Sequence, residues 1–352
     1  MKASTTTVHT HTSRAKTVGK TPLPVGKLPL KLLERLLRSI PSGDPNILAG
    51  PGIGVDAAVV RFGDQTLVFK TDPITFTSED ISRYLVTINA NDIACMGGIP
   101  RYLLVTFLLP AGPTTPASVE ELFSDLRQAC AAMDVTLIGG HTEITHGIER
   151  PLAIGFMIGV MEEGAAHRPR NAGAGDLILL SKRIPIEAVS IIASEASGRL
   201  DIDEQTLAEA RLLIRDPGIS IFKEARIAWD HGGVTAMHDP TEGGLATGLR
   251  ELALASGCGV EVYQDRIPVL PIAEKILPHF GIDPLGALAS GSLVVCCEED
   301  RAEGIIAAWA ENGVEGSIIG RLTKARDMVI VRDGVRRELP EFPADEITKI
   351  FS

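Results

Sequence analysis

The stretch from residue 67 to residue 100 constrains the fold of this chain more than any other part of its sequence. A largely apolar run at 66–69 predicts a buried strand, which delivers Lys70 and Asp72 to its C-terminal end. Pro73 then follows, and because it lacks a backbone N–H it cannot make a normal ladder bond. The chain therefore presents a lysine and a carboxylate together at the end of one strand.

A helix is predicted to follow, with Ser78 as its N-cap and an end near Met96, because Gly97-Gly98 comes next. Asn89 and Asp92 are three residues apart and therefore share one face of this helix. Together with the carboxylate at the strand end they could converge on one cation, and hard oxygen ligands suit Mg²⁺ that carries a nucleotide phosphate. The alternative is that these polar groups are caps and solvated carboxylates.

Composition limits the class of protein. The chain has 352 residues, enough for two domains, and its 45% hydrophobic content with only 4% aromatics predicts a large aliphatic core. A formal net charge of −11 argues against nucleic acid or an anionic membrane as the main partner. No run approaches the ~18 apolar residues of a membrane span, and the N-terminus lacks the apolar core of a signal peptide. Five cysteines without a CxxC spacing predict a reduced, cytoplasmic setting.

Strand and helix patterns follow one another in a mixed order, which predicts an α+β protein. Residues 1–27 are rich in Thr, Lys and His and predict a flexible tail, although their positive charge could also close over a polyphosphate. A polar, turn-rich segment at 164–175 predicts the boundary between an N-terminal domain, 28–165, and a C-terminal domain, 166–352. Both halves show a rhythm of strand, helix, strand and Gly-Gly, which permits two related lobes.

A glycine-rich loop at 45–54 precedes a predicted hairpin. Gly52 and Gly54 allow close approach of the backbone to a ligand, and exposed N–H groups of such a loop can cradle phosphate. Asp56 follows directly after the loop. One glycine loop alone is a weak indication of a phosphate site.

A second glycine pair, Gly139 and Gly140, directly follows a short predicted strand and leads into His141, Thr142 and Glu143. The glycines could let the backbone approach a ligand, while the Thr142 hydroxyl and the Glu143 carboxylate could reach phosphate and Mg²⁺. The alternative is a tight turn with solvated polar groups. His141 and His146 could suggest zinc, but no third histidine or cysteine lies nearby to support a tetrahedral site, so zinc is not predicted.

The same logic applies at residues 238–244, where a predicted strand ends in His238, Asp239 and Thr241 and a helix begins. The N-terminus of that helix points at the polar loop, and helix N-termini bind anions. Thr241 could instead simply be the N-cap of the helix.

Four segments together resemble the aminoimidazole ribonucleotide (AIR) synthase superfamily, which also contains formylglycinamidine ribonucleotide synthase, thiamine-monophosphate kinase, selenophosphate synthetase and the hydrogenase-maturation protein HypE. The resemblance covers about residues 28–340 in the right order, and the HypE branch is nearest in pattern. The Asn-Asp to Gly-x-Pro segment is fairly specific, while the glycine pairs are weaker. The segments are Thr71-Asp72, NANDIACMGGIP at 89–100, GGHTE at 139–143 and DPTEGGL at 239–245.

The resemblance implies a two-lobed AIR-synthase-like fold in which the N-terminal lobes of two subunits pair their sheets into the barrel-like core of a homodimer. It also implies ATP beside that interface and Mg²⁺ held by carboxylates. On this basis the candidate metal ligands are Asp56, Asp72, Asp92 and Glu143. The candidate ATP-binding residues are Gly52, Gly54, Lys70, Asn89, Gly139, Gly140 and Thr142, and the candidate catalytic residues are His238, Asp239 and Thr241.

The chain departs from the family pattern at three points. Val55 stands where the family has the first Asp of an Asp-Asp pair, and His141 stands where many members have Asp or Glu, which Glu143 could compensate. HypE carries its substrate group on a C-terminal cysteine, whereas this sequence ends in Ser352 and its last cysteine is Cys297. The chain is therefore expected to be HypE-like in scaffold without performing the HypE reaction alone.

The expected function is that of an ATP-dependent enzyme. It would transfer a phosphoryl group from Mg·ATP to an amide or carbonyl oxygen, or to a phosphate acceptor, of a small-molecule substrate. Three alternatives remain: a true AIR synthase, a thiamine-monophosphate-kinase-like enzyme, and a non-catalytic ATP-binding protein that serves a maturation partner.

Overall fold

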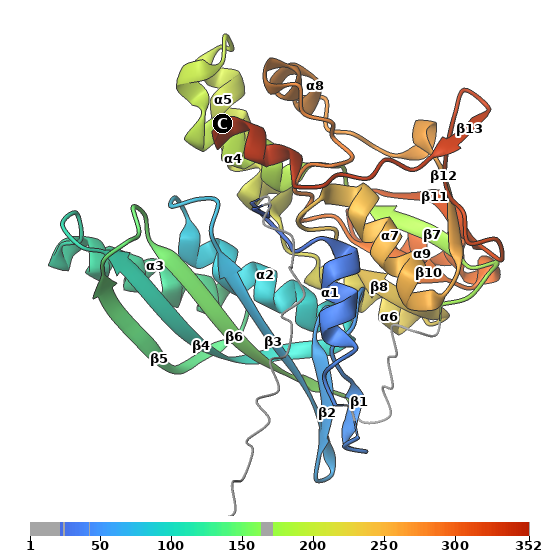
Figure 1. The fold of residues 1–352 in the computed structure, drawn as a ribbon, viewed down its shortest axis with the longest axis horizontal. Helices are drawn as coiled ribbons and strands as arrows, with labels where there is room; N and C mark the ends of the chain where they lie inside the picture. Colours follow the sequence, from blue (N-terminus) through green and yellow to red (C-terminus); the bar gives the residue numbers. More distant parts are fainter. Residues whose placement is uncertain (1–21, 24, 42, 163–171, 352) are drawn as a thin grey trace, which may run out of the picture.

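The computed structural model describes residues 22–23, 25–41, 43–162 and 172–351, and it has an α+β fold built on two β-sheets (Figure 1). Most of the predicted flexible tail, residues 1–27, lies outside the described residues. The predicted domain boundary between 165 and 166 lies outside them as well. Within these ranges, no helix is both long enough and apolar enough to cross a membrane.

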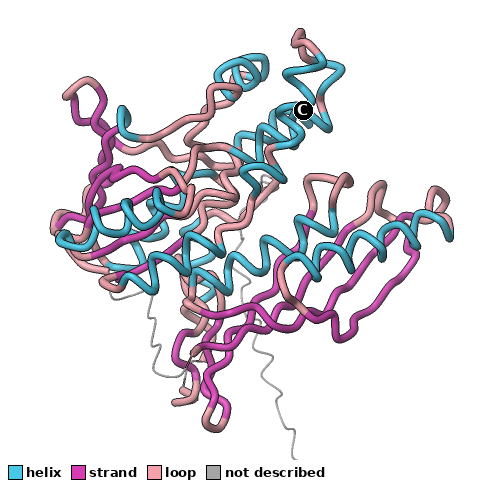
Figure 2. The backbone as a smooth tube through the Cα atoms, turned by 180° about the vertical axis from the view of Figure 1, so that it is seen from behind, coloured by secondary structure: helices cyan, strands magenta, loops and turns pink. Residues whose placement is uncertain are grey.

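The first sheet belongs to the N-terminal lobe and has the strand order β1-β2-β3-β6-β4-β5. Helices α2 and α3 cover one face of this sheet, and Figures 1 and 2 show no described helix on the opposite face. The strands are β1 (Ile47–Ala49), β2 (Ala58–Phe62), β3 (Gln65–Ile74), β4 (Gly98–Pro110), β5 (Thr136–Thr145) and β6 (Leu152–Met161). The helices are α1 (Leu30–Leu37), α2 (Ile81–Cys95) and α3 (Pro116–Ala132).

The predicted hairpin is confirmed, because β2 pairs antiparallel with β3 across a turn in which Gly63 has φ +63°. The predicted end of the central strand is wrong. Strand β3 continues through Pro73 to Ile74, and Pro73 pairs with Ile154 of β6. Strand geometry therefore carries the chain past Asp72 and toward the second lobe.

The predicted helix cap at Ser78 is also wrong. Helix α2 begins at Ile81, after Asp80 in the left-handed conformation with φ 51°, and no side chain caps it. The backbone N–H of Ser78 instead donates to the Glu195 side chain of the second lobe at 3.3 Å. This contact between lobes holds Ser78 outside the helix.

The segment Gly139 to Glu143 is not a turn after a strand but the middle of strand β5, which pairs parallel with β4 at the edge of the sheet. The reason lies in packing. A Cβ atom on Gly140 would lie 1.8 Å from the carbonyl oxygen of Val105 in β4. Glycine is needed here because two strands approach each other closely, whatever else the segment does.

The second sheet forms the core of the C-terminal lobe, with the order β13-β12-β9-β11-β7-β10-β8. The strand predicted to end at His238 is confirmed, because a strand of this sheet ends at that residue. The strands are β7 (Leu177–Ser181), β8 (Val234–His238), β9 (Gly259–Tyr263), β10 (Val294–Cys297), β11 (Gly316–Thr323), β12 (Met328–Arg332) and β13 (Val335–Glu338). The α-helices are α4 (Ile186–Glu195), α5 (Glu204–Leu212), α6 (Phe222–His231), α7 (Gly244–Ser256), α8 (Ala273–Ile276) and α9 (Ala302–Glu311).

Helix α2 joins the two lobes. Every residue of the helix except Arg83 is buried, because the first sheet lies on one side and the C-terminal lobe on the other. Asn91 fixes this contact: its side chain donates to the carbonyl oxygen of Ile219 at 2.8 Å and accepts from the backbone N–H of Ile221 at 3.0 Å. Helix α2, which carries Asn89 and Asp92, therefore lies at the junction of the lobes.

Candidate active site

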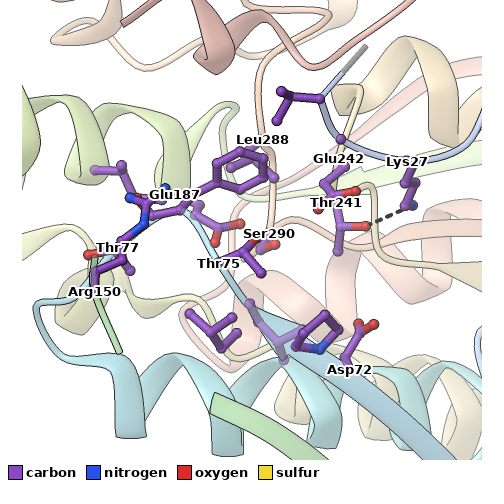
Figure 3. Close-up of a pocket in the computed structure, with 17 residues that line it drawn as sticks. Lys27, Asp72, Thr75, Thr77, Arg150, Glu187, Thr241, Glu242, Leu288 and Ser290 are labelled. Atoms are coloured by element: carbon purple, nitrogen blue, oxygen red, sulfur yellow. Dashed lines mark hydrogen bonds between the residues drawn. The ribbon is translucent and has the colours of Figure 1, made fainter. Parts of the chain in front are cut away.

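A cavity of about 500 Å³ lies between the two lobes (Figure 3). The N-terminal segment, the end of β3, helix α4 and the loops before α7 and β10 all contribute to its lining. Its polar lining residues are Lys27, Asp72, Thr75, Thr77, Arg150, Glu187, Thr241, Glu242 and Ser290. A cavity of this size can hold a small molecule or part of a nucleotide.

Lys70, Asp72 and Asp92 meet beside this cavity; the sequence predicts the approach of the two aspartates, whereas their contact with Lys70 is an addition. The Lys70 ammonium lies 3.4 Å from Asp72 Oδ2 and 3.1 Å from Asp92 Oδ2. Asp92 is 2% exposed, and burial raises its pKa well above the usual value while Lys70 opposes the rise. Burial alone would lower the pKa of Lys70, but Asp92 and Asp72 raise it above its usual value. The lysine is therefore a fixed positive charge between two carboxylates.

Asp56, Asp239 and Cys95 form a second acidic group close to the first. One ligand atom from each of the three lies within 4.8 Å of the others. Asp239 is 1% exposed, and burial together with the charge of Asp56 raises its pKa to about 6. The Cys95 thiol points at Asp239 Oδ1 from 3.9 Å, and burial and the nearby carboxylates raise its pKa well above the usual value. Cys95 is therefore a protonated thiol beneath the acids.

His238 lies behind these acids, and both of its ring nitrogens are engaged. Nδ1 is 2.7 Å from Asp56 Oδ1, and Nε2 is 2.9 Å from Glu251 Oε2 on helix α7. Burial alone would lower the pKa of His238, but the two carboxylates raise it well above its usual value. Both nitrogens therefore donate, and the imidazolium joins the loop that follows Gly54 to helix α7.

Thr241 lies at the rim of the cavity and not at a helix cap. Helix α7 begins at Gly244 after Gly243 in the left-handed conformation, so the alternative prediction of Thr241 as N-cap is wrong. Its hydroxyl accepts from the Lys27 ammonium at 3.1 Å, and Lys27 also lies 4.0 Å from Glu251. The structure thus brings the end of the positively charged N-terminal segment over the cavity.

The predicted ATP-binding residues lie in three places. Lys70 is in the cluster already described, and Asn89 is beneath it, donating to Leu85 O at 2.9 Å with its Oδ1 unpartnered among the described residues. Gly52 lines a hollow between α1 and α7, and Gly54 packs directly against α7. A Cβ on Gly54 would lie 2.7 Å from the carbonyl oxygen of Glu251, so this glycine permits close packing of the loop on the helix.

The remaining candidates lie on strand β5, at the edge of the first sheet opposite β1 (Figure 1), and none of them lines the cavity. Thr142 and Glu143 are exposed there, and Glu143 Oε2 lies 3.5 Å from His141 Nε2. Within one copy of the chain, Gly139, Gly140, Thr142 and Glu143 are thus separated from the other candidate residues.

The charge and burial of the acidic clusters fit a hard divalent cation. Asp56 Oδ2 and Asp239 Oδ2 have no hydrogen-bond partner among the described residues, and Asp92 Oδ2 has only its ion pair with Lys70. Buried carboxylate oxygens without partners are costly unless a ligand completes them. Oxygen ligands of this type match Mg²⁺ better than a soft metal. The residues able to hold such an ion are therefore Asp56, Asp72, Asp92 and Asp239.

Sequence reasoning missed several residues of the site. Lys27, Glu251 and Ser290 carried no recognisable motif. Cys95 lies at the end of the predicted helix, and nothing in its local sequence indicates a contact with buried acids. Glu187 did carry a signal, because it is an acidic residue in the apolar run of helix α4, where a buried helix rarely places one.

Two family models match the chain. The N-terminal domain model of AIR synthase related proteins matches residues 54–161, and the C-terminal domain model matches residues 173–333. A putative hydrogenase expression/formation protein of Methanocaldococcus jannaschii is 28% identical over 333 residues, which are 91% of this chain and 96% of that protein. Carbamoyl dehydratase HypE of Escherichia coli is 26% identical over 307 residues, which are 84% of this chain and 87% of that protein.

Solved structures share the fold. HypE in complex with ATP has a TM-score of 0.69 at 23% identity, covering 86% of this chain and 92% of that one. A HypE–HypF complex has a TM-score of 0.69 at 22% identity, covering 82% of this chain and 93% of that one. ThiL complexed with AMPPCP and TMP gives 0.68 at 18% identity, covering 89% and 94%. The two family models cover well over half of the 352 residues in the predicted order, so the chain belongs to the AIR synthase related protein family.

Proposed function

We propose that this protein is an ATP-dependent enzyme that transfers a phosphoryl group to an oxygen of a small-molecule substrate. One observation carries the proposal: a cavity between the lobes has Lys27 in its lining, and Lys70 with a set of buried, incompletely paired carboxylates lies beside it. Fixed positive charges and carboxylates able to hold Mg²⁺ are what phosphoryl transfer requires, because charge is redistributed over the phosphoryl oxygens.

The relatives support the same chemistry. HypE binds ATP in one structure, and ThiL carries AMPPCP together with TMP in another. The E. coli relative is a carbamoyl dehydratase. Since those proteins share the fold, we assign a nucleoside triphosphate to the end of the cavity near Lys70 and Lys27.

Each side chain has a proposed part. Lys70 and Lys27 hold the phosphate oxygens, and Asp56, Asp72 and Asp92 hold Mg²⁺. When bound, Mg²⁺ neutralises charge on the phosphate oxygens and orients them. The reaction forms a bond between the acceptor oxygen and the γ-phosphorus and breaks the bond to the β-phosphate oxygen, so ADP leaves.

Asp239 and Thr241 are the proposed catalytic residues. A carboxyl group whose pKa is about 6 can accept a proton near neutral pH, and Asp239 is such a group. The Thr241 hydroxyl lies at the cavity rim beside Lys27, where it can contact the transferred group. For His238 we propose a positioning role in place of direct catalysis, because both ring nitrogens already hold carboxylates.

We also propose that the protein works as a homodimer. The uncovered face of the first sheet carries apolar side chains, and Phe156 of β6 remains 40% exposed and Tyr102 of β4 45% exposed. A second copy that covers this face would bury them. It would also bring strand β5, with Thr142 and Glu143, against a neighbouring subunit, which offers those candidates a place near an active site.

A maturation partner is a further proposal, because a relative was solved as a HypE–HypF complex.

The central proposal is tested by measuring ADP release with MgATP and a set of small amides, alcohols and phosphate monoesters, while ATP binding is followed by calorimetry. Lys70→Met should lose measurable ATP affinity, whereas Lys324→Met, an exposed lysine of the second lobe, should not. Unchanged ATP affinity in Lys70→Met would refute the assignment. ATP binding without ADP release under any condition would favour the non-catalytic alternative.

A further inference from the structure

The cavity contains a buried acid that the proposed phosphoryl transfer does not use. Glu187 lies in the first turn of α4 and lines the cavity (Figure 3). It is 5% exposed, and its Oε2 has no hydrogen-bond partner among the described residues. Ser290 lines the same cavity, is fully buried, and has an Oγ that also lacks a partner there. Two buried polar groups that line the cavity thus lack hydrogen-bond partners, which costs free energy unless a ligand supplies those hydrogen bonds.

The electrostatic surroundings of Glu187 are negative. Burial raises the pKa of Glu187 to about 8, the nearby Ser290 hydroxyl opposes the rise, and Asp345, Glu242 and Asp239 add to it. No hydrogen bond of good geometry joins Ser290 to Glu187. A positive charge placed beside Glu187 would lower this pKa, so that the carboxyl group releases its proton and, together with the neighbouring acids, attracts the cation.

The two cations of the cavity lining are engaged elsewhere. Lys27 donates to Thr241 and lies near Glu251. The Arg150 guanidinium donates to the carbonyl oxygen of Phe76 at 3.3 Å and lies 5.3 Å from the ring centre of Phe351. The cation that would complement Glu187 has to come from outside these residues.

We propose that Glu187 and Ser290 recognise a cationic nitrogen of the substrate, an ammonium or amidinium group, and so determine which class of molecule is phosphorylated. This inference rests on the proposed function. An N–H donor with positive charge completes the Glu187 carboxylate, and a second N–H reaches the Ser290 hydroxyl. The first turn of α4 supports the ionised carboxylate, because the helix dipole favours negative charge there. A neutral carboxamide would form similar hydrogen bonds but gain nothing from the surrounding charge, and an anion would be repelled.

The position of this pair suits an acceptor site. Figure 3 shows Glu187 and Ser290 between Arg150 on one side and Thr241 with Lys27 on the other. A molecule held by its nitrogen in the middle of the cavity can direct an oxygen toward Thr241, where the phosphoryl donor is assigned. The substrate class is thus a small molecule with a cationic nitrogen and a nearby nucleophilic oxygen, such as an amino alcohol.

The test compares matched probes. Amino alcohols and hydroxyalkyl amidines are each paired with their N-acetyl counterparts, which keep an N–H donor but lose the charge. Binding is measured by thermal unfolding and calorimetry, with and without AMPPCP and Mg²⁺, and turnover by ADP release. We expect binding and turnover with cationic members, and an affinity about tenfold or more weaker in Glu187→Gln, the loss expected for a hydrogen bond to a charged group. ATP affinity should remain unchanged in this variant.

The control is Ser190→Ala, which removes a buried hydroxyl from the same helix that donates to Arg211 O and does not line the cavity. It should bind the probes as the wild type does, whereas Ser290→Ala should bind them more weakly. Equal binding of charged and acetylated probes, no binding of any cationic probe, or equal affinity in wild type and Glu187→Gln would overturn the inference. Because ATP binding is measured separately, a wild-type protein that does not bind ATP would instead refute the proposed function.

Discussion

Replacing His238 by glutamine should destabilise the fold far more than an ordinary polar substitution. In the wild type the imidazolium donates to Asp56 at 2.7 Å and to Glu251 at 2.9 Å, and all three side chains are less than a tenth exposed. Glutamine keeps hydrogen-bonding capacity but carries no charge, and its single amide nitrogen cannot easily reach both carboxylates. The variant therefore leaves two buried acids without their cation.

The size of the effect follows from the contacts. Each hydrogen bond to a charged group contributes about 1.5–3 kcal/mol net, and removing one partner of a buried ion pair typically costs about 3–5 kcal/mol. Glu251 keeps Lys27 at 4.0 Å, which offsets part of the loss. We therefore expect the free energy of unfolding to fall by about 3–5 kcal/mol in His238→Gln.

The assay is urea denaturation followed by fluorescence and far-UV circular dichroism. His279→Gln is the matched control, because His279 is exposed and makes a single hydrogen bond, to the carbonyl oxygen of Lys275 at 3.0 Å. A double-mutant cycle with Asp56→Asn isolates the coupling, which should exceed about 1 kcal/mol for groups in direct contact. A loss below about 1 kcal/mol, or additive single effects, would refute the idea that this histidine holds the two carboxylates together.

The pH dependence has a definite sign. Burial opposes protonation, but Asp56 and Glu251 raise the pKa of His238 well above its usual value in the folded protein. The stabilisation from the imidazolium is then fully present below about pH 6.5, the value for an unfolded chain, and is lost as the pH rises through the raised folded pKa. The stability difference between wild type and His238→Gln should therefore shrink in alkaline solution.

Three further predictions concern the metal, the assembly and the thiols. Calorimetry should find MgATP binding weaker by about 1–3 kcal/mol in Asp72→Asn and Asp92→Asn, the loss of a charge-assisted contact, and unchanged affinity in both would exclude the metal assignment. Light scattering should find a dimer, and Phe156→Asp should dissociate it. The control is Val335→Asp, at an exposed apolar site on the other sheet, which should leave the dimer intact. A monomeric wild type would contradict the proposed homodimer. Intact-mass measurement after incubation with a carbamoyl-transfer partner and ATP should find no carbamoyl or cyano adduct on the five cysteines, four of which are buried; an adduct lost on replacing Cys258 would restore a role for an internal thiol.

Local patterns predicted much of the fold because they depend on residues close in sequence. The strand that carries Lys70 and Asp72, the helix that carries Asp92 and the strand that ends at His238 all follow from apolar runs and stop signals. These elements place their polar residues at strand ends and on one helix face. The predicted approach of Asp72 and Asp92 is one that such local geometry can specify.

Contacts between distant residues could not be predicted in the same way. His238 and Asp56 are 182 positions apart, and nothing in either local sequence indicates their partnership. The glycine pair at Gly139 and Gly140 shows the opposite failure, since its local pattern indicated a turn but the close approach of strand β4 keeps it in a strand. In both cases the deciding neighbour lies elsewhere in the chain.

The buried ionisable groups of this protein are of two kinds: some have an oppositely charged partner within the chain, and Glu187 has none among the described residues. Lys182 lies 2.7 Å from Glu224 and also donates to the carbonyl oxygen of Ser220, so this buried pair is satisfied within the second lobe and contributes to its structure. His238 is completed in the same way by two carboxylates. Glu187 is as deeply buried, yet among the described residues no cation pairs with it and further acids lie nearby. An acid kept in such a position raises the energy of the unliganded protein, and a positively charged ligand is the partner that removes this cost.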